Sequence, residues 1–142
     1  MSPVARPVIL TLTGHYLPGF RAGGPVRSIA NLVENLGDAF EFRILCADRD
    51  LGDAEPYPGI VPERWTPVGR ASVSYLPPAS QTLPSLARII RETTHDAFYL
   101  NSFFSPRFSI LPLAARRLGL VPRRPLVLAP RGEFSPGALE LK

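Results

Sequence analysis

Short apolar runs recur along this chain, and between them apolar residues have helical spacing. The runs predict strands at Val8–Thr13, Phe40–Cys46, Ser72–Leu76, Ala97–Asn101 and Leu126–Ala129. The helical spacing predicts a helix over Pro25–Leu36, a second that starts near Pro84, a third over Phe108–Leu118 and a last one from Gly137. Strands and helices are therefore expected to alternate along the chain.

The predicted strands are continuously apolar rather than alternating, which is typical of a parallel sheet with both faces covered. We therefore expect an α/β fold, a three-layer α/β/α domain with a Rossmann-like parallel sheet over residues 1–142. Residues 48–70 interrupt this pattern with Asp48-Arg49-Asp50 and several prolines and glycines. The pattern predicts a long irregular loop within the domain, which folds over the sheet edge or borders a site.

Composition fits one globular domain. Of the 142 residues, 45% are hydrophobic and 20% charged, so a packed core is expected. The net charge of +4 comes mostly from scattered arginines, which favours a solvated basic surface over a nucleic-acid face. The single cysteine, Cys46, excludes an internal disulfide and is predicted to be buried. Without a signal peptide or a membrane-length apolar run, the expected location is cytoplasmic.

Polar residues at the predicted carboxyl ends of the strands mark the candidate site, because open parallel sheets bind ligands there. Three segments are expected to converge: Gly23-Gly24, Asn101–Ser105 and Arg131–Ser135. They offer backbone amides, an amide side chain, hydroxyls, a guanidinium, a carboxylate and aromatic rings. This set suits a hydroxyl-rich ligand with an anionic part, and glycines before a helix suit phosphate.

Each of these residues also has a structural interpretation. Gly23-Gly24 can form a plain tight turn, and Asn101 can cap the next helix or bond to loop backbone. Phe103 can belong to the core beneath the loop. Arg131 can pair with Glu133 instead of a phosphate. On the residues alone, both sets of interpretations stay open.

The two histidines differ in their predicted positions. His15 lies just past the first strand and is a candidate general base, or else a hydrogen-bonding surface residue. His95 precedes a strand, at the opposite edge, and is interpreted as structural. Their spacing argues against a zinc site, so no metal is expected. The chain also lacks the G-x-G-x-x-G, P-loop and G-x-S-x-G patterns.

Three motifs resemble those of GT-B glycosyltransferases, specifically glycosyltransferase family 4. Tyr16–Phe20 with Gly23–Ile29 resembles the first loop and helix of that family. Asp96–Leu113 is similar to its fourth strand and following helix. Pro130–Leu139 resembles the Pro-Arg-Gly-x-x-x-Pro-x-Ala-Leu signature of a subgroup. The resemblance covers most of the chain, and residues 48–70 match least.

The resemblance implies the N-terminal half of a GT-B fold, whose missing C-terminal Rossmann-like domain holds most of the donor. It implies transfer from a nucleotide-diphosphate sugar, with retention, to a glycan or lipid-linked acceptor, without a bound metal or cofactor. Gly23 and Gly24 would place backbone amides near the donor diphosphate and stabilise its charge. Many relatives carry a histidine where Asn101 stands and another near Arg131. An asparagine can donate and accept hydrogen bonds there but cannot act as an acid or a base. The sequence does not identify the catalytic residues, and the candidates are Asn101 and, from its place after the first strand, His15.

The residues expected to bind donor phosphate or acceptor are Gly23, Gly24, Arg27, Asn101, Ser102, Phe103, Arg131, Gly132 and Glu133. We expect an acceptor-binding domain of a transferase for bacterial polysaccharide or glycolipid synthesis, inactive alone because the donor half is missing. Because the sequence stops where the last predicted helix begins, we expect either that its tail packs against something absent or that it is a fragment of a longer protein. The alternative is a stand-alone module that binds a nucleotide or a sugar phosphate without catalysis.

A weak peripheral contact with the inner face of the membrane is a further expectation. It would use two aromatic residues and four arginines near a helix end: Phe103, Phe104, Arg116, Arg117, Arg123 and Arg124. The same arginines also complement a helix dipole at an ordinary surface. No nucleic-acid partner is expected.

Overall fold

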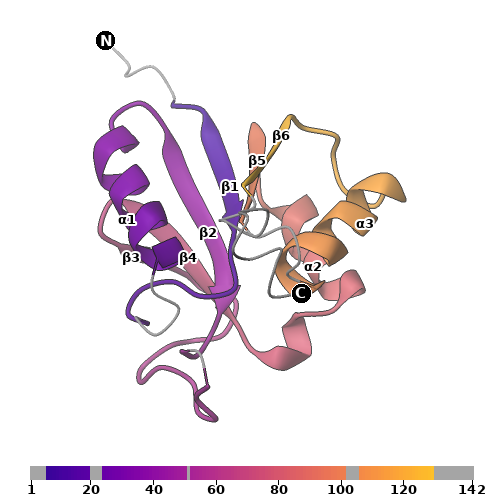
Figure 1. The fold of residues 1–142 in the computed structure, drawn as a ribbon. Coiled ribbons are helices and arrows are strands. Elements are labelled where there is room, and N and C mark those ends of the chain that lie inside the picture. Colours follow the sequence, from indigo (N-terminus) through magenta and orange to yellow (C-terminus); the bar gives the residue numbers. More distant parts are fainter. Residues whose placement is uncertain (1–5, 20–23, 51, 102–105, 130–142) are drawn as a thin grey trace, which may run out of the picture.

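A six-stranded sheet separates two layers of helices (Figure 1). The computed structural model describes residues 6–19, 24–50, 52–101 and 106–129. The strands are β1 (Val8–Leu12), β2 (Glu41–Ala47), β3 (Trp65–Val68), β4 (Ala71–Leu76), β5 (Ala97–Asn101) and β6 (Leu126–Ala129). Their order is β3-β4-β2-β1-β5-β6, and every neighbouring pair is parallel except β3 with β4. The predicted α/β, Rossmann-like class is confirmed.

The helices cover both faces of the sheet. They are α1 (Gly24–Leu36), α2 (Leu83–Glu92) and α3 (Leu111–Arg117), with a 3-10 turn η1 (Pro78–Ser80) before α2 and a π-helical turn η2 (Pro106–Ile110) before α3. On one face, Ile29 of α1 packs in a cluster with Ile44 and Val73 of the sheet. On the other face, Leu86 and Ile90 of α2 pack with Leu100. Figure 1 shows α1 on one side and α2 and α3 on the other.

The predicted elements form close to their expected bounds. Each of the five strands from the sequence is present, with ends shifted by at most one residue. α1 begins at Gly24, one residue before the predicted start at Pro25. α2 begins beside Pro84, where the Thr82 hydroxyl accepts a hydrogen bond from the Ser85 N–H at 3.4 Å and caps the helix. The helix expected from Gly137 lies outside the described residues.

β3 corrects two predictions, that the sheet is all parallel and that residues 48–70 are irregular throughout. It forms an antiparallel hairpin with β4, in which Val68 pairs with Ala71. Gly69 adopts φ +59 in the turn, which suits a residue without a Cβ. Pro67 lies within β3 and has no N–H to donate, so β3 can only lie at the sheet edge. That proline conceals the strand in the sequence pattern.

The strand order reverses at β1. From β1 the chain proceeds through α1 to β2, and β4 pairs with β2 on the same side. After β4 the chain passes through α2 and reaches β5, on the other side of β1. A crevice outside the carboxyl ends of the strands is expected at such a reversal. The fold therefore favours a ligand site around the end of β1.

The side chain of Glu63 links the segment between β2 and β3 to η1 and α2 through a hydrogen bond and an ion pair. Its carboxylate accepts a hydrogen bond from the Ser80 hydroxyl at 2.5 Å and lies 2.9 Å from the Arg88 guanidinium. Its backbone N–H donates to the Tyr75 carbonyl at 3.0 Å. The hydrogen bonds from Ser80 and Arg88 hold the pKa of Glu63 below its ordinary value of 4.5. The ionised carboxylate therefore stabilises the folded state.

We expect Glu63→Gln to lower the free energy of unfolding by about 1 kcal/mol near neutral pH, because a partly exposed, charge-assisted contact is lost. Since the folded-state pKa is lowered, this contribution is complete above pH 4.5 and disappears as the pH falls through the folded-state pKa. Urea unfolding of both proteins at neutral and strongly acid pH measures the change.

Glu92→Gln is the matched control, because Glu92 pairs with the same Arg88 at 3.4 Å but its side chain is 65% exposed. Its effect should stay below about 0.5 kcal/mol. Equal losses in the two variants, or a Glu63 effect that grows in acid, would contradict this account.

Candidate functional site

A pocket of about 360 Å³ opens at the carboxyl ends of β1, β2 and β4. Ligand pockets typically measure roughly 300–1,000 Å³, so this one suits a small ligand. Its lining residues are Gly14, His15, Ala47, Arg49, Asp50, Gly52, Asp53, Pro78, Gln81, Arg107 and Phe108. The pocket therefore lies at the edge where parallel sheets bind their ligands.

Backbone hydrogen bonds past the ends of the strands build the base of this pocket. The N–H of Thr13, just after β1, donates to the Leu45 carbonyl at 3.0 Å, and the Ala47 N–H donates to the Gly14 carbonyl at 3.0 Å. The Asp48 N–H, just after β2, donates to the Leu76 carbonyl at 3.1 Å. These contacts fix the segments that follow β1 and β2 against the neighbouring strands β2 and β4.

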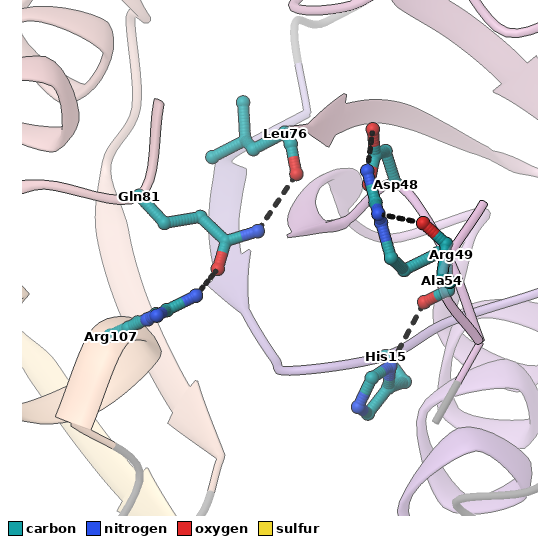
Figure 2. Close-up of polar contacts among 7 residues, drawn as sticks. All are labelled: His15, Asp48, Arg49, Ala54, Leu76, Gln81 and Arg107. Atoms are coloured by element: carbon teal, nitrogen blue, oxygen red, sulfur yellow. Dashed lines mark hydrogen bonds and ion pairs between the residues drawn. The ribbon is translucent and has the colours of Figure 1, made fainter. Parts of the chain in front are cut away.

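One wall of the pocket is built from His15 and the segment after β2. The Nδ1 of His15 lies 3.2 Å from the Arg49 carbonyl. The Nε of Arg49 donates to a carboxylate oxygen of the buried Asp48 at 2.8 Å, and the guanidinium also donates to the Ala54 carbonyl (Figure 2). The hydrogen bond to Asp48 raises the pKa of Arg49. Arg49 is thus a charged group whose partner is already in place.

The opposite wall is built from Gln81 and Arg107. The Nε2 of the buried Gln81 donates to the Leu76 carbonyl at 2.8 Å, at the end of β4. The Oε1 of Gln81 accepts a hydrogen bond from the Arg107 guanidinium at 3.0 Å. Figure 2 shows this pair across the pocket from His15 and Arg49. A chain of two hydrogen bonds therefore links the Arg107 guanidinium to the sheet.

Two tyrosine hydroxyls hold the turn between β1 and α1. The Tyr57 hydroxyl donates to the Tyr16 carbonyl at 3.3 Å, and the Tyr75 hydroxyl donates to the Leu17 carbonyl. The two rings meet edge to face, with centroids 5.6 Å apart. Burial raises the pKa of both Tyr57 and Tyr75, so these hydroxyls keep their protons and remain donors at any ordinary pH.

Position 19 requires a glycine because Tyr57 and Asp50 approach it closely. A Cβ at position 19 would lie 2.3 Å from the Tyr57 hydroxyl oxygen and 3.0 Å from a carboxylate oxygen of Asp50. The Gly19 N–H donates to the Tyr16 carbonyl at 3.0 Å, which closes the turn. The segment before α1 and the segment after β2 therefore pack as one unit beside the pocket.

The structure describes four of the predicted site residues, and it places them in different surroundings. His15 lines the pocket, whereas Arg27 is exposed on α1 and Gly24 is the first residue of that helix. Asn101 is buried, and its amide donates to the Leu12 carbonyl at 3.4 Å. This contact agrees with the structural interpretation, a bond to nearby backbone.

The other predicted positions lie outside the described residues. They are Gly23, Ser102, Phe103, Phe104, Arg131, Gly132 and Glu133. The convergence of the three segments at one site therefore stays a prediction. The same is true of the membrane contact, for which the structure shows only that Arg117, Arg123 and Arg124 are exposed.

Sequence reasoning missed most of the polar lining of the pocket. Neither the loop residues Arg49, Asp50 and Asp53 nor Gln81 and Arg107 were identified as candidates, although residues 48–70 were expected to border a site. The sequence does indicate the loop residues, because Asp48-Arg49-Asp50 directly follows a predicted strand, where ligand-binding residues of parallel sheets lie. Nothing in the sequence pattern brings Gln81 next to Arg107, because that contact depends on how α2 and η2 pack.

Groups away from the pocket behave as structural residues. His95 is buried at the opposite edge of the sheet, its Nδ1 lies 2.8 Å from the Thr93 carbonyl, and burial lowers its pKa. Cys46 is buried as predicted, and burial raises its thiol pKa.

Within the described residues, no group of three His, Cys, Asp or Glu side chains is placed to hold a metal ion. None of the helices in this part of the chain is long and apolar enough to cross a membrane.

Comparison with protein families, with curated proteins and with solved structures finds no significant match to this chain. The function therefore has to be argued from the fold and the pocket.

We expect Gly19→Ala to destabilise the domain by roughly 1–3 kcal/mol, because the added methyl group displaces the Tyr57 hydroxyl from the Tyr16 carbonyl. Urea unfolding followed by circular dichroism measures the loss. Gly14→Ala is the matched control, since a Cβ there meets nothing within 4 Å.

A double variant tests whether the lost stability comes from the clash with the Tyr57 hydroxyl or from strain elsewhere in the loop. Adding Tyr57→Phe to Gly19→Ala removes the opposing oxygen and should recover part of the lost stability. A Gly19→Ala protein as stable as the unaltered domain would contradict the close approach.

Proposed function

We propose that this domain is the acceptor-binding half of a retaining glycosyltransferase that uses a nucleotide-sugar donor. The observation that supports it most is the polar pocket at the carboxyl ends of β1, β2 and β4, beside the turn that leads to α1. A transferase needs two ligands held close together, and in this proposal the pocket holds the acceptor while the donor lies mainly on a second domain.

The lining of the pocket suits a hydroxyl-rich acceptor. Carboxylates of Asp50 and Asp53 can accept hydrogen bonds from sugar hydroxyls, and the Arg107 guanidinium can donate them. Such groups, fixed in place by the surrounding fold, set the orientation of a ligand in a small pocket. The mixture of donors and acceptors fits a sugar better than an apolar ligand.

His15 is the residue that we assign to the acceptor hydroxyl. When its Nδ1–H donates to the Arg49 carbonyl, the neutral ring presents Nε2 as an acceptor. An acceptor nitrogen in the pocket can orient the hydroxyl that attacks the donor sugar. Asn101 is less suited to contact the sugar, because it is buried and bonded to the Leu12 carbonyl.

The donor would lie mainly on a second Rossmann-like domain. In this proposal Gly23 and Gly24 approach its diphosphate from the acceptor side, where backbone N–H groups before a helix stabilise negative charge. The likeness of Tyr16–Phe20 and Gly23–Ile29 to the first loop and helix of glycosyltransferase family 4 supports this assignment.

Calorimetry with nucleotides tests the proposal against its alternative, a stand-alone nucleotide-binding module. We expect UDP-glucose and GDP-mannose to bind the domain with a Kd above about 1 mM, since the larger part of the donor site is elsewhere. We also expect no sugar transfer to glycan acceptors by the domain alone. A Kd in the low micromolar range would favour the binding module, and sustained transfer would contradict a half-site.

A further inference from the structure

Two guanidinium groups line the pocket, and their environments differ. Arg49 lies 2.8 Å from the buried carboxylate of Asp48, so its charge is already balanced by the protein. Arg107 is exposed, and its hydrogen bond is to the neutral amide of Gln81. Among the described residues, no carboxylate lies within ion-pair distance of Arg107. Among the described residues that line the pocket, Arg107 therefore offers a positive charge to a ligand.

Gln81 orients Arg107 without neutralising it. The Gln81 side chain is buried, and its Nε2 is bound to the Leu76 carbonyl at 2.8 Å, so its Oε1 is directed to Arg107 (Figure 2). A guanidinium has five N–H donors, and Gln81 takes one of them. A neutral acceptor thus fixes the position of the guanidinium and leaves its full charge for an anion.

The other wall of the pocket carries carboxylates beside Arg49. Asp50 and Asp53 belong to the same segment as Arg49 and also line the pocket. Carboxylates repel phosphate but accept hydrogen bonds from hydroxyl groups. A ligand that satisfies both walls carries an anionic group at the Arg107 end and hydroxyls at the other. A sugar that bears a phosphate has this arrangement.

We propose that the pocket binds a phosphorylated sugar, with Arg107 contacting the phosphate and Gln81 acting as a positioning residue for that guanidinium. This inference rests on the proposed function and names the class of its acceptor. The phosphate could belong to a free sugar phosphate or to the headgroup of a lipid-linked sugar. Both present the same phosphate and hydroxyl groups to the two walls.

Isothermal titration calorimetry with glucose 1-phosphate and with glucose tests the assignment. We expect the phosphorylated sugar to bind at least about tenfold more tightly. Arg107→Gln should abolish that preference, because it weakens the binding of glucose 1-phosphate far more than the binding of glucose. Gln81→Glu should also reduce the preference, because its carboxylate would pair with Arg107. Glycerophosphoinositol, a soluble lipid headgroup, replaces glucose 1-phosphate in a parallel arm.

Arg117→Gln is the matched control, since it removes the same charge from an exposed position outside the pocket lining. It should leave the Kd for glucose 1-phosphate within about twofold of the unaltered value. Circular dichroism confirms that each variant is folded. Tighter binding of glucose 1-phosphate supports a free sugar phosphate, and tighter binding of glycerophosphoinositol supports a lipid headgroup.

Equal affinity for glucose, glucose 1-phosphate and glycerophosphoinositol, or an Arg107→Gln protein that keeps the preference for a phosphorylated ligand, would overturn this inference. Either result leaves the acceptor-domain proposal in place, because that proposal is judged by nucleotide affinity and transfer. Tight nucleotide binding would instead refute the acceptor-domain proposal, whatever the role of Arg107.

Discussion

Hydrogen bonds between backbone groups just past β1 and β2 and residues near the ends of the neighbouring strands β2 and β4 hold the pocket edge of this domain together. Thr13 bonds to Leu45, Ala47 to Gly14, and Asp48 to Leu76. Buried backbone groups need partners, so the chain after each strand has to follow its neighbour before it can turn away. The pocket, its two walls and the tyrosine contacts all depend on this continued pairing.

Buried polar side chains gather at this edge of the sheet. Asp48, Asp50 and Gln81 are buried there, next to a pocket that opens to solvent. Burying a charge is costly unless it is paired, and Asp48 meets that requirement with Arg49. At the opposite edge the buried His95 carries a lowered pKa and packs against Phe98. A concentration of polar groups around this pocket favours a ligand site there.

The fold was largely predictable from the sequence, because continuously apolar strands leave few arrangements other than a covered parallel sheet. β3 was not predictable, because the strand is short and contains Pro67, so its segment resembles a loop in the sequence. The site was only partly predictable. His15 directly follows a predicted strand, so it could be predicted as a site residue. Arg107 could not, because it reaches the pocket only through the packing of η2. For Asn101 the sequence left a ligand contact and a bond to nearby backbone open, and its 3.4 Å hydrogen bond to the Leu12 carbonyl agrees with the second.

The central claim is that a phosphorylated sugar binds at the pocket between His15 and Arg107. Nuclear magnetic resonance measures this most directly, with glucose 1-phosphate titrated into the isotope-labelled domain. The account predicts the largest amide shifts at Gly14, His15, Gln81 and Arg107, with little change in the segment after α3. Shifts concentrated around Leu118 and Leu120, or none in the pocket at saturating sugar phosphate, would contradict it.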